Sequence, residues 1–338
     1  MKTYNATLLV IVRDGKILLA KKKRGFGIGL WNGVGGKIEK GETVEEALVR
    51  ETHEEIGITI TKFEPVARLA FDEYVKGERA NVLVYVYRAT DFTGEPVESD
   101  EMTPQWFDLG KIPYDDMFPD DTFWLPRVLD GQKVRGLFKY DKDVNMGSMS
   151  VIDVDDLDEE LFDVLDENGN FTGEIVGRNV AHEKGVWHRA VGLYIVNHKG
   201  EVLCQKRSAT KKLWPGCWDF SCGGHVEAGE LGQGTAIREA EEELGLIIDP
   251  RDVRYICDCR SDKVMGKIHD RHFNEFFVAF VDVNLKNIKL QETEVDEVKY
   301  IPYDEFYAMV HSRSPVLTSK WESHEALVRY IDKYEVKK

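Results

Sequence analysis

Three glutamates, Glu51, Glu54 and Glu55, carry the residue types and spacing that point most directly to chemistry. They lie in the stretch GKIEKGETVEEALVRETHEEIGI. Spacings of three and four residues place their carboxylates on one face of a helix. Like charges on one face repel each other, so this arrangement is costly unless a cation lies among them. Hard oxygen ligands suit Mg2+ or Mn2+, and the stretch therefore predicts a divalent-metal site.

The residues around the glutamates predict the helix that positions them. Thr43 and Glu46 have the spacing of a capping box at the helix start, and Gly57 supplies a stop. Upstream, the glycine-rich run GFGIGLWNGVGG lets backbone approach a ligand closely. The preceding basic cluster KKKR provides positive charge that can attract a triphosphate.

The same stretch occurs a second time as GHVEAGELGQGTAIREAEEELGL. Its landmarks are displaced by a constant number of residues, since 224 − 36 and 243 − 55 both equal 188. The sequence therefore contains an internal duplication with two units of domain size. Gly232 and Gly234 disfavour the helical state, so the second helix is expected to begin near Thr235.

Composition narrows the classes of function. A chain of 338 residues is long enough for two domains, each with its own core. The net charge of −16 argues against a polynucleotide substrate, which needs a basic surface. No membrane-length apolar run is present, and the five cysteines lack CxxC spacing. We expect a cytoplasmic enzyme that acts on small molecules, with no membrane partner.

Hydrophobic patterning outlines two α/β domains, residues 1–145 and 160–338, joined by an acidic linker over 146–159. The expected elements of the first domain are strands at 5–12, 16–20, 60–71, 80–90, 105–109 and 134–140, with a helix at 121–129. The second is expected to have a hairpin turning at 168–169, strands at 253–262 and 272–283, and helices at 179–184, 303–311 and 322–335.

Both copies fit the pattern G-x5-E-x7-R-E-U-x-E-E-x-G-U, where U is aliphatic, and so resemble the Nudix box. The resemblance implies two tandem Nudix α/β/α sandwich domains with mixed sheets. It also implies that Arg50 and Arg238 hold the glutamates in position through ion pairs. The first copy departs from the pattern at Thr52, where the cost is one of local packing. An exposed acidic helix is the alternative, which two full matches disfavour.

The flanks of the first box resemble the mammalian MutT-homologue 8-oxo-dGTP diphosphatases over residues 5–140. The carrying segments are KKRGFGIGLWNGVGGK and ESDEMTPQWFDLGKIPYDDMFPDDTFWLPRVL. The resemblance implies a metal set and a substrate set. The metal set is Gly35, Glu51, Glu54, Glu55 and Glu101. The substrate set is Thr7, Lys22, Asn32, Phe118, Pro119, Asp120 and Asp121. The family has tryptophan at the position of Phe118, so the stacking area is smaller here.

These residue types suit an oxidised purine. Asn32 can donate and accept, and a buried Asp120–Asp121 pair would keep one member protonated, because two adjacent charges are costly. Phe26 and Phe118 are candidates for an apolar wall against a flat base. The alternative for the aspartates is a charge pair at a helix N-terminus.

The second half resembles the branch of the Nudix family related to isopentenyl-diphosphate isomerase, over residues 160–310. The carrying segments are FDVLDENGN, AHEKGVWHRAVGLYIVN and QKRSATKKLWPGCWDFSCGGHVEAGE. True isomerases have a catalytic cysteine where this chain has Gly223, and Cys222 lies one residue early, as a small buried packing residue. The box is intact here, which favours a phosphohydrolase.

The resemblance implies a second metal set of Gly223, Glu239, Glu242 and Glu243. Further candidates are Glu297 for the role of Glu101, Arg207, Lys211 and Lys212 for phosphate contacts, and His182, His188 and His225 as the metal histidines of the isomerase. An ordinary structural role is the alternative for each histidine, and a solvated loop for the basic residues.

The sequence is therefore interpreted as a Mg2+-dependent (or Mn2+-dependent) hydrolase of nucleoside diphosphates linked to another group. Metal-held water attacks phosphorus, with Glu54 or Glu55 as general base and Glu242 or Glu243 in the second box. For the first domain the resemblance implies 8-oxo-dGTP sanitation, which keeps oxidised nucleotides out of DNA. The second would hydrolyse an unidentified diphosphate. Alternatively, it is a non-catalytic nucleotide-binding or regulatory module, or an isomerase.

Overall fold

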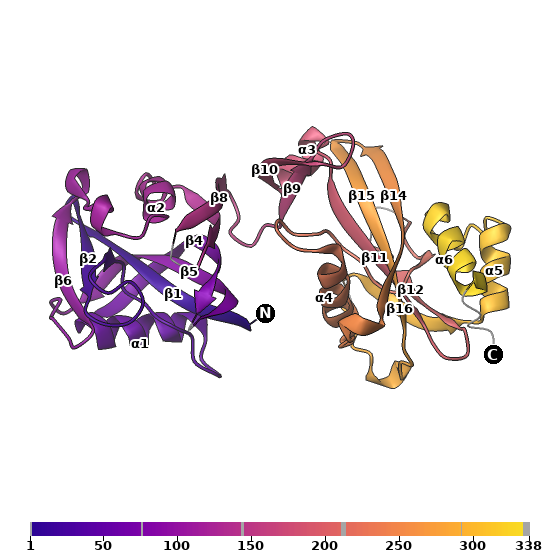
Figure 1. The fold of residues 1–338 in the computed structure, drawn as a ribbon, viewed down its shortest axis with the longest axis horizontal. Coiled ribbons are helices and arrows are strands. Elements are labelled where there is room, and N and C mark those ends of the chain that lie inside the picture. Colours follow the sequence, from indigo (N-terminus) through magenta and orange to yellow (C-terminus); the bar gives the residue numbers. More distant parts are fainter. Residues whose placement is uncertain (1, 76, 143–144, 211–213, 292, 334–338) are drawn as a thin grey trace. The chain divides into compact units, whose positions relative to one another are not determined.

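The protein is described by a computed structural model that covers residues 2–75, 77–142, 145–210, 214–291 and 293–333. The chain divides into two compact units, residues 1–159 and 160–338. In each unit, helices pack on a sheet that contains both parallel and antiparallel strand pairs (Figure 1). The prediction of two α/β domains with mixed sheets is confirmed.

The first unit is built on an eight-stranded sheet with the order β3-β2-β1-β5-β4-β7-β8, in which β6 also pairs with β2. Its strands are β1 (Lys2–Arg13), β2 (Lys16–Lys22), β3 (Trp31–Asn32), β4 (Thr59–Val75), β5 (Glu78–Thr93), β6 (Met102–Asp108), β7 (Lys133–Tyr140) and β8 (Met146–Val154). Its helices are α1 (Val44–Ile56) and α2 (Asp121–Leu129).

Alternation along β1 places its side chains on both faces of this sheet. Leu9 packs in one cluster with Leu48 of α1, and Val10 packs in the other with Trp124 of α2. The two helices therefore cover opposite faces, and the sheet is buried between them. This sandwich brings the acidic face of α1 against the loop that follows β3.

The α1 helix has the capping predicted from its sequence. Thr43 accepts a hydrogen bond from the Glu46 backbone N–H, and the Glu46 side chain accepts from the Thr43 N–H in return. Gly57 closes the helix in the left-handed conformation. Thr52 lies on the buried face, and its hydroxyl donates to the Leu48 carbonyl at 2.7 Å. Its departure from the aliphatic pattern therefore leaves no polar group unpaired.

We expect Thr43→Ala to destabilise the first unit by about 1 kcal/mol, because the substitution leaves an N-terminal amide of α1 without its side-chain acceptor. Urea unfolding of wild type and variant would measure the difference. Thr43→Ser, which keeps the hydroxyl, is the matched control and should stay close to wild type. Equal loss in both variants would contradict the capping role.

The second unit has a six-stranded sheet with the order β13-β12-β11-β15-β14, in which β16 pairs with β12, and a separate β9–β10 hairpin. Its strands are β9 (Leu161–Leu165), β10 (Phe171–Gly177), β11 (His188–Val196), β12 (Val202–Arg207), β13 (Trp218–Asp219), β14 (Val253–Met265), β15 (Ile268–Phe280) and β16 (Val295–Ile301). Its helices are α3 (Arg178–Lys184), α4 (Gly232–Leu244), α5 (Tyr303–His311) and α6 (Trp321–Lys333).

Helices again cover both faces of this sheet. Leu193 of β11 packs in one cluster with Ala240 of α4, and Tyr194 packs in the other with Phe306 of α5 and Leu327 of α6. The second box helix, α4, thus has the same relation to its sheet as α1 has in the first unit.

Two local expectations differ from the structure. Residues 146–154 of the expected linker form β8, which pairs with β7 and places Val151 against the first core. The α4 helix begins at Gly232, earlier than Thr235. A Cβ atom at Gly232 would lie 2.2 Å from the Glu275 carboxylate, so a side chain there would require Glu275 to move. Among the described residues, no helix is long and apolar enough to cross a membrane.

Candidate functional site

Arg50 organises the glutamates of the first box. Its guanidinium donates to both carboxylate oxygens of Glu42, at 2.8 and 2.9 Å. Its Nη1 donates to Glu51 at 2.8 Å and to Glu54 at 3.2 Å. The hydrogen bond from Arg50 is the main cause that lowers the pKa of Glu42 to about 2. A guanidinium bound to three carboxylates fixes their positions, which is the orienting role predicted for it.

Glu55 is the most buried glutamate of this box and lies against the glycine loop. Its Oε2 accepts a hydrogen bond from the Gly35 N–H at 2.9 Å, and burial raises its pKa to about 7. Gly35 has φ of 154°, and a Cβ atom there would lie 2.2 Å from the Thr7 carbonyl. A Cβ at Gly36 would meet the Glu51 carboxylate at 2.4 Å. Only glycine lets this loop contact both glutamates so closely.

Glu101 and Lys22 contribute charge at the same place. Burial is the largest cause that raises the pKa of Glu51 and Glu55, and the Glu101 carboxylate raises both further. Lys22 opposes this effect at Glu55. The structure thus brings Glu101 to Glu51 and Glu55, as expected for a shared metal site. The Thr7 hydroxyl lies beside the loop, 3.5 Å from the Gly36 carbonyl.

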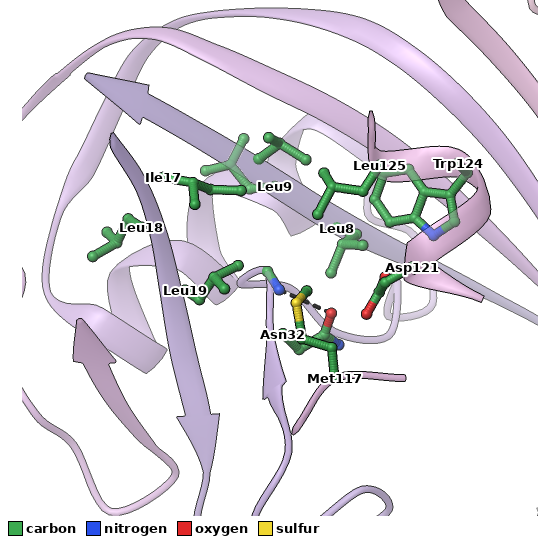
Figure 2. A pocket seen from close by; sticks show the side chains of 12 residues that line it. Leu8, Leu9, Ile17, Leu18, Leu19, Asn32, Met117, Asp121, Trp124 and Leu125 are labelled. Carbon is green, nitrogen blue, oxygen red and sulfur yellow. Dashed lines mark hydrogen bonds between the residues drawn. The ribbon is translucent and has the colours of Figure 1, made fainter. Parts of the chain in front are cut away.

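A pocket lies on the α2 side of the first sheet, where Asn32 and Asp121 are its polar side chains (Figure 2). Apolar side chains make up the rest of its wall, namely Leu8, Leu9, Val10, Ile17, Leu18, Leu19, Met117, Trp124 and Leu125. Outside this lining, the rings of Phe26 and Phe118 stack with centroids 5.5 Å apart. Pro119 is exposed.

Asp120 and Asp121 are both buried, so they are not the solvated charge pair of a simple helix start. Tyr140 Oη donates to Asp120 at 2.7 Å and Trp124 Nε1 donates at 3.2 Å. Burial raises the pKa of both aspartates, and the Asp120 charge raises that of Asp121 further, to well above its ordinary value. The pKa is raised further for Asp121 than for Asp120, so Asp121 is the member of the pair in which the protonated form, a hydrogen-bond donor, is favoured more.

The buried pair should make the stability of the first unit fall as the pH rises. An unfolded aspartate loses its proton near pH 4, whereas folded Asp121 keeps its proton to higher pH. Its contribution is therefore fully present below about pH 4 and is lost as the pH rises through the raised pKa. Hydrogen exchange of α2 peptides, corrected for intrinsic rates, should show this slope in wild type and in Asp115→Asn, an exposed control. The slope should be smaller in Asp121→Asn, where only Asp120 of the pair remains, and an unchanged slope would contradict the assignment.

The second box repeats the geometry of the first. Arg238 Nη1 donates to Glu242 at 2.9 Å and lies 3.1 Å from Glu239. Its Nη2 donates to the His225 carbonyl at 3.4 Å, as Arg50 donates to the Lys37 carbonyl at 3.2 Å. Burial raises the pKa of Glu239 to about 7, and Glu243 is likewise buried.

The glycines of the second loop are required in the same way. A Cβ at Gly223 would lie 2.4 Å from the Val191 carbonyl, and one at Gly224 would lie 2.3 Å from Glu239. Cys222 is fully buried in the core cluster with Leu193, and burial raises the pKa of its thiol well above the usual range. Since the thiolate is the reactive form, this cysteine has a packing role.

Backbone contacts identify which residues of the second domain correspond to Lys22 and Glu101. The Lys23 N–H donates to the Glu101 carbonyl, and the Ser208 N–H donates to that of Glu294. Glu294, and not Glu297, therefore occupies the position of Glu101. Glu297 instead lies 3.9 Å from Lys206. Arg207 takes the position of Lys22, and the phosphate candidates Lys211 and Lys212 lie outside the described residues.

Five side chains of the second domain converge in a way that the sequence only partly anticipated. One ligand atom from each lies within 4.8 Å of all the others, and the set is His182, His188, His225, Asp270 and His272. Nε2 of His188 is buried and makes no hydrogen bond, while Nε2 of His272 lies 2.5 Å from Oδ1 of Asp270. A buried polar atom without a partner is costly, and a cation held among these ligand atoms would give His188 Nε2 a partner.

The electrostatics of this cluster fit a metal. Burial lowers the pKa of His182 and His188, the latter to about 3, and lowers that of His225 well below its ordinary value. These imidazoles are therefore neutral at pH 7, which is the form that binds metal. A Phe162 ring stacked on His188 at 4.5 Å restricts its orientation.

The sequence indicated His182 of α3, His188 of β11 and His225 of the glycine loop as candidates. It did not indicate Asp270 and His272. These two lie on β15 and reach the site because His188 and His272 are partners in the parallel β11–β15 register. It also missed Tyr140 and Trp124, which hold Asp120. The alternation D-x-H in the first residues of β15 was the available signal.

Comparison with known proteins gives a family match to both halves of the chain. The family model described as the NUDIX domain matches residues 1–128 and 186–320. An oxidized purine nucleoside triphosphate hydrolase of Danio rerio is 46% identical over 134 residues, which are 40% of this chain and 85% of that protein.

The chain is also similar to an isomerase and to a protein of known structure. An isopentenyl-diphosphate Delta-isomerase of Cutibacterium acnes is 30% identical over 168 residues, 48% of this chain and 84% of that protein. Among solved structures, a MutT protein from Bacillus halodurans aligns over 44% of this chain and 97% of its own, with 26% identity and a TM-score of 0.40.

Proposed function

Because the chain belongs to the Nudix hydrolase family and carries its domain twice, we propose that the first domain hydrolyses oxidised purine nucleoside triphosphates to the monophosphate and inorganic pyrophosphate. The observation that carries this proposal is the buried Asp120–Asp121 pair beside Asn32, in the same domain as an intact set of box glutamates. Hydrolases of this family generally use divalent metal ions, and here we propose Mg2+ or Mn2+ held by Glu51, Glu54, Glu55, Glu101 and the Gly35 carbonyl.

The residues of the first box have separate roles in the proposed hydrolysis. A divalent metal held by these residues would lower the pKa of the attacking water and polarise phosphoryl oxygens. We assign to Glu55 the acceptance of a proton from that water, because it is the most buried box glutamate and the Gly35 N–H holds it against the glycine loop. Arg50 keeps the glutamates in place, and Lys22 offers a positive charge to the phosphate chain.

The pocket supplies specificity for the oxidised base. A protonated Asp121 donates a hydrogen bond to the purine edge, while Asn32 can donate and accept. The stacked Phe26 and Phe118 provide an apolar surface for a flat ring. A site that leaves a buried polar group unpaired rejects the wrong substrate strongly, so an unoxidised purine is disfavoured.

Asp121→Asn tests this assignment through selectivity. We expect the ratio of kcat/KM for 8-oxo-dGTP to that for dGTP to fall about tenfold or more, since one lost hydrogen bond to a buried polar group has about this effect. Asp115→Asn, an exposed change on the same segment, is the control and should keep the ratio. If Asp121→Asn left this ratio unchanged, the pocket would not be the site that recognises the oxidised base.

For the second domain we propose hydrolysis of a different diphosphate. Arg238 pairs with Glu239 and Glu242 as Arg50 pairs with Glu51 and Glu54, and Glu243 is buried as Glu55 is. Isomerase chemistry is disfavoured, because Gly223 has no side chain and the Cys222 thiol is buried and inert. A second domain that only binds nucleotide would retain its ligand unchanged. Hydrolysis of a panel of diphosphates by the Glu55→Gln protein distinguishes a catalytic second domain from one that only binds.

We further propose that the histidine cluster of the second domain holds one divalent transition metal. Neutral imidazoles suit Zn2+, Fe2+ or Ni2+ more than Mg2+, so this centre differs in chemistry from the all-oxygen box site. The observations in its favour are the convergence of five ligand atoms within 4.8 Å of one another and the buried His188 Nε2, which makes no hydrogen bond.

A further inference from the structure

The second domain contains a counterpart of the pocket segment of the first domain. Trp31 forms a parallel bridge with Met117, shortly before α2, and Trp218 forms a parallel bridge with Leu317, shortly before α6. Trp31 pairs with β2, and Trp218 pairs with β12 in the same antiparallel manner. The two bridges therefore align the residues that follow Met117 with those that follow Leu317.

This alignment places residues of different charge at equivalent positions. Lys320 stands where the first domain has Asp120, and Asp219 stands where it has Asn32. The Asp219 side chain is fully buried, 3.1 Å from Lys320 Nζ and 3.6 Å from Arg207 Nη1. Its oxygens are therefore engaged by neighbouring cations. Asn32 is proposed to contact the base in the first domain, whereas Asp219, at the equivalent position, is already occupied by these ion pairs.

A third position, on the β4–β5 hairpin of the first domain and the β14–β15 hairpin of the second, changes from acidic to basic, as the position of Asp120 and Lys320 does. The box loop bridges the central strand at Ala6 in the first domain and at Ala190 in the second. When the strand registers are followed outward from these bridges, Glu73 of β4 and Lys263 of β14 occupy the same position.

The edge position and the pocket segment interact in each domain. In the first domain, burial and then the Asp120 charge raise the pKa of Glu73. In the second, burial and then the Lys320 charge lower the pKa of Lys263 to about 8. The two interacting acidic groups of the first domain, Glu73 and Asp120, are thus replaced by two interacting basic groups, Lys263 and Lys320, in the second.

The two ammonium groups gather around one aromatic ring. Lys263 Nζ lies 3.6 Å from the centroid of the Trp214 ring, and Lys320 Nζ lies 5.7 Å from it and 3.9 Å from that of Phe220. Trp214 itself has φ of 46°, a conformation that costs energy for a residue other than glycine. In the part of the chain that the structure describes, no carboxylate lies within 4.0 Å of Lys263 Nζ.

We propose that the second domain takes a diphosphate whose other end carries a further anionic group, a phosphate or a carboxylate, which Lys263 and Lys320 bind beside Trp214. The proposal rests on the hydrolase function proposed for this domain. An apolar prenyl tail is disfavoured, because it would desolvate the Lys263 ammonium without pairing it, whereas Lys320 already has Asp219 as a partner. An oxidised purine is disfavoured because Asp219 is already engaged.

The experiment is a binding comparison on the full-length Glu55→Gln/Glu243→Gln protein with Mg2+, in which both general bases are removed so that ligands persist. Calorimetry would use three probes: inorganic pyrophosphate, isopentenyl diphosphate with its apolar tail, and 5-phosphoribosyl 1-diphosphate with its phosphorylated tail. We expect the phosphorylated ligand to bind most tightly. Adding Lys263→Gln should weaken that ligand about tenfold or more and leave pyrophosphate unchanged. Lys267→Gln, in the exposed turn of the same hairpin, should change neither.

Three results would overturn the proposal. The first is an absence of preference for the phosphorylated ligand over isopentenyl diphosphate. The second is equal binding of that ligand with and without Lys263→Gln, and the third is an equal loss for pyrophosphate, which would place Lys263 at the diphosphate itself. Turnover is measured separately on Glu55→Gln protein. If the Glu55→Gln protein hydrolyses no diphosphate, the second domain is not a hydrolase. The binding preference is then still tested independently by the calorimetry.

Discussion

Glu55→Gln is expected to lower kcat for 8-oxo-dGTP hydrolysis by about 10³-fold, because loss of a general base at this position removes the proton acceptor for the attacking water. Glutamine keeps the size of the side chain and an oxygen that can accept from the Gly35 N–H, so the loop should remain in place. Pyrophosphate release in the presence of Mg2+ would measure the effect, with the fold checked by circular dichroism.

The internal duplication offers a matched control for this prediction. Glu243→Gln makes the same change at the corresponding position of the second box and should leave 8-oxo-dGTP turnover at the wild-type rate. If Glu55→Gln retains full activity, the first box is not the site of the reaction. If Glu243→Gln abolishes activity, the second domain hydrolyses this nucleotide and the division of labour is wrong.

His188→Ala is expected to remove the transition metal from the second domain. We expect wild-type protein incubated with Zn2+ and dialysed against Mg2+ buffer to retain one zinc ion that the variant loses, since removing one imidazole leaves an incomplete and poorly oriented ligand set. Mass spectrometry of metal content gives the readout. His198→Ala removes an exposed histidine outside the cluster and should retain the ion.

Because His188 is fully buried, its loss can also disturb folding, so His272→Asn serves as a second variant with a polar side chain of smaller size. We expect zinc to be lost from this variant too, while 8-oxo-dGTP hydrolysis by the first domain continues. Zinc retained by both variants at the wild-type ratio would show that the cluster is not the metal centre.

The box helices could be predicted from sequence because their signals are local. Helical spacing alone places Glu51, Glu54 and Glu55 on one face, and Thr43 with Glu46 marks where α1 begins. The positions of β1 and β2 followed from apolar runs and from Asp14-Gly15 for the same reason, although both strands extend beyond the predicted 5–12 and 16–20. The predicted helix 121–129 coincides with α2. Strand β8 was missed because a short alternating segment gains its stability from pairing with β7, which no local pattern reveals.

The two features of the second domain that go beyond its box depend on register. Asp270 and His272 join the histidines only because β15 pairs in parallel with β11 at one particular offset. Lys263 and Lys320 come from a strand and a helix start that are far apart in the chain, and they meet at Trp214 through the β14 hairpin. Sequence spacing carries no information on such contacts, whereas resemblance to a family did supply Asp120 and Asp121.

The measurement that tests the central claim most directly is the comparison of 8-oxo-dGTP with dGTP as substrates of the Glu243→Gln protein, with Mg2+ and with the products identified. We expect 8-oxo-dGMP and inorganic pyrophosphate as the products, with a clearly higher rate for 8-oxo-dGTP than for dGTP. Equal rates on the two nucleotides, or no hydrolysis of either, would contradict the assignment of the first domain to oxidised purine nucleotides.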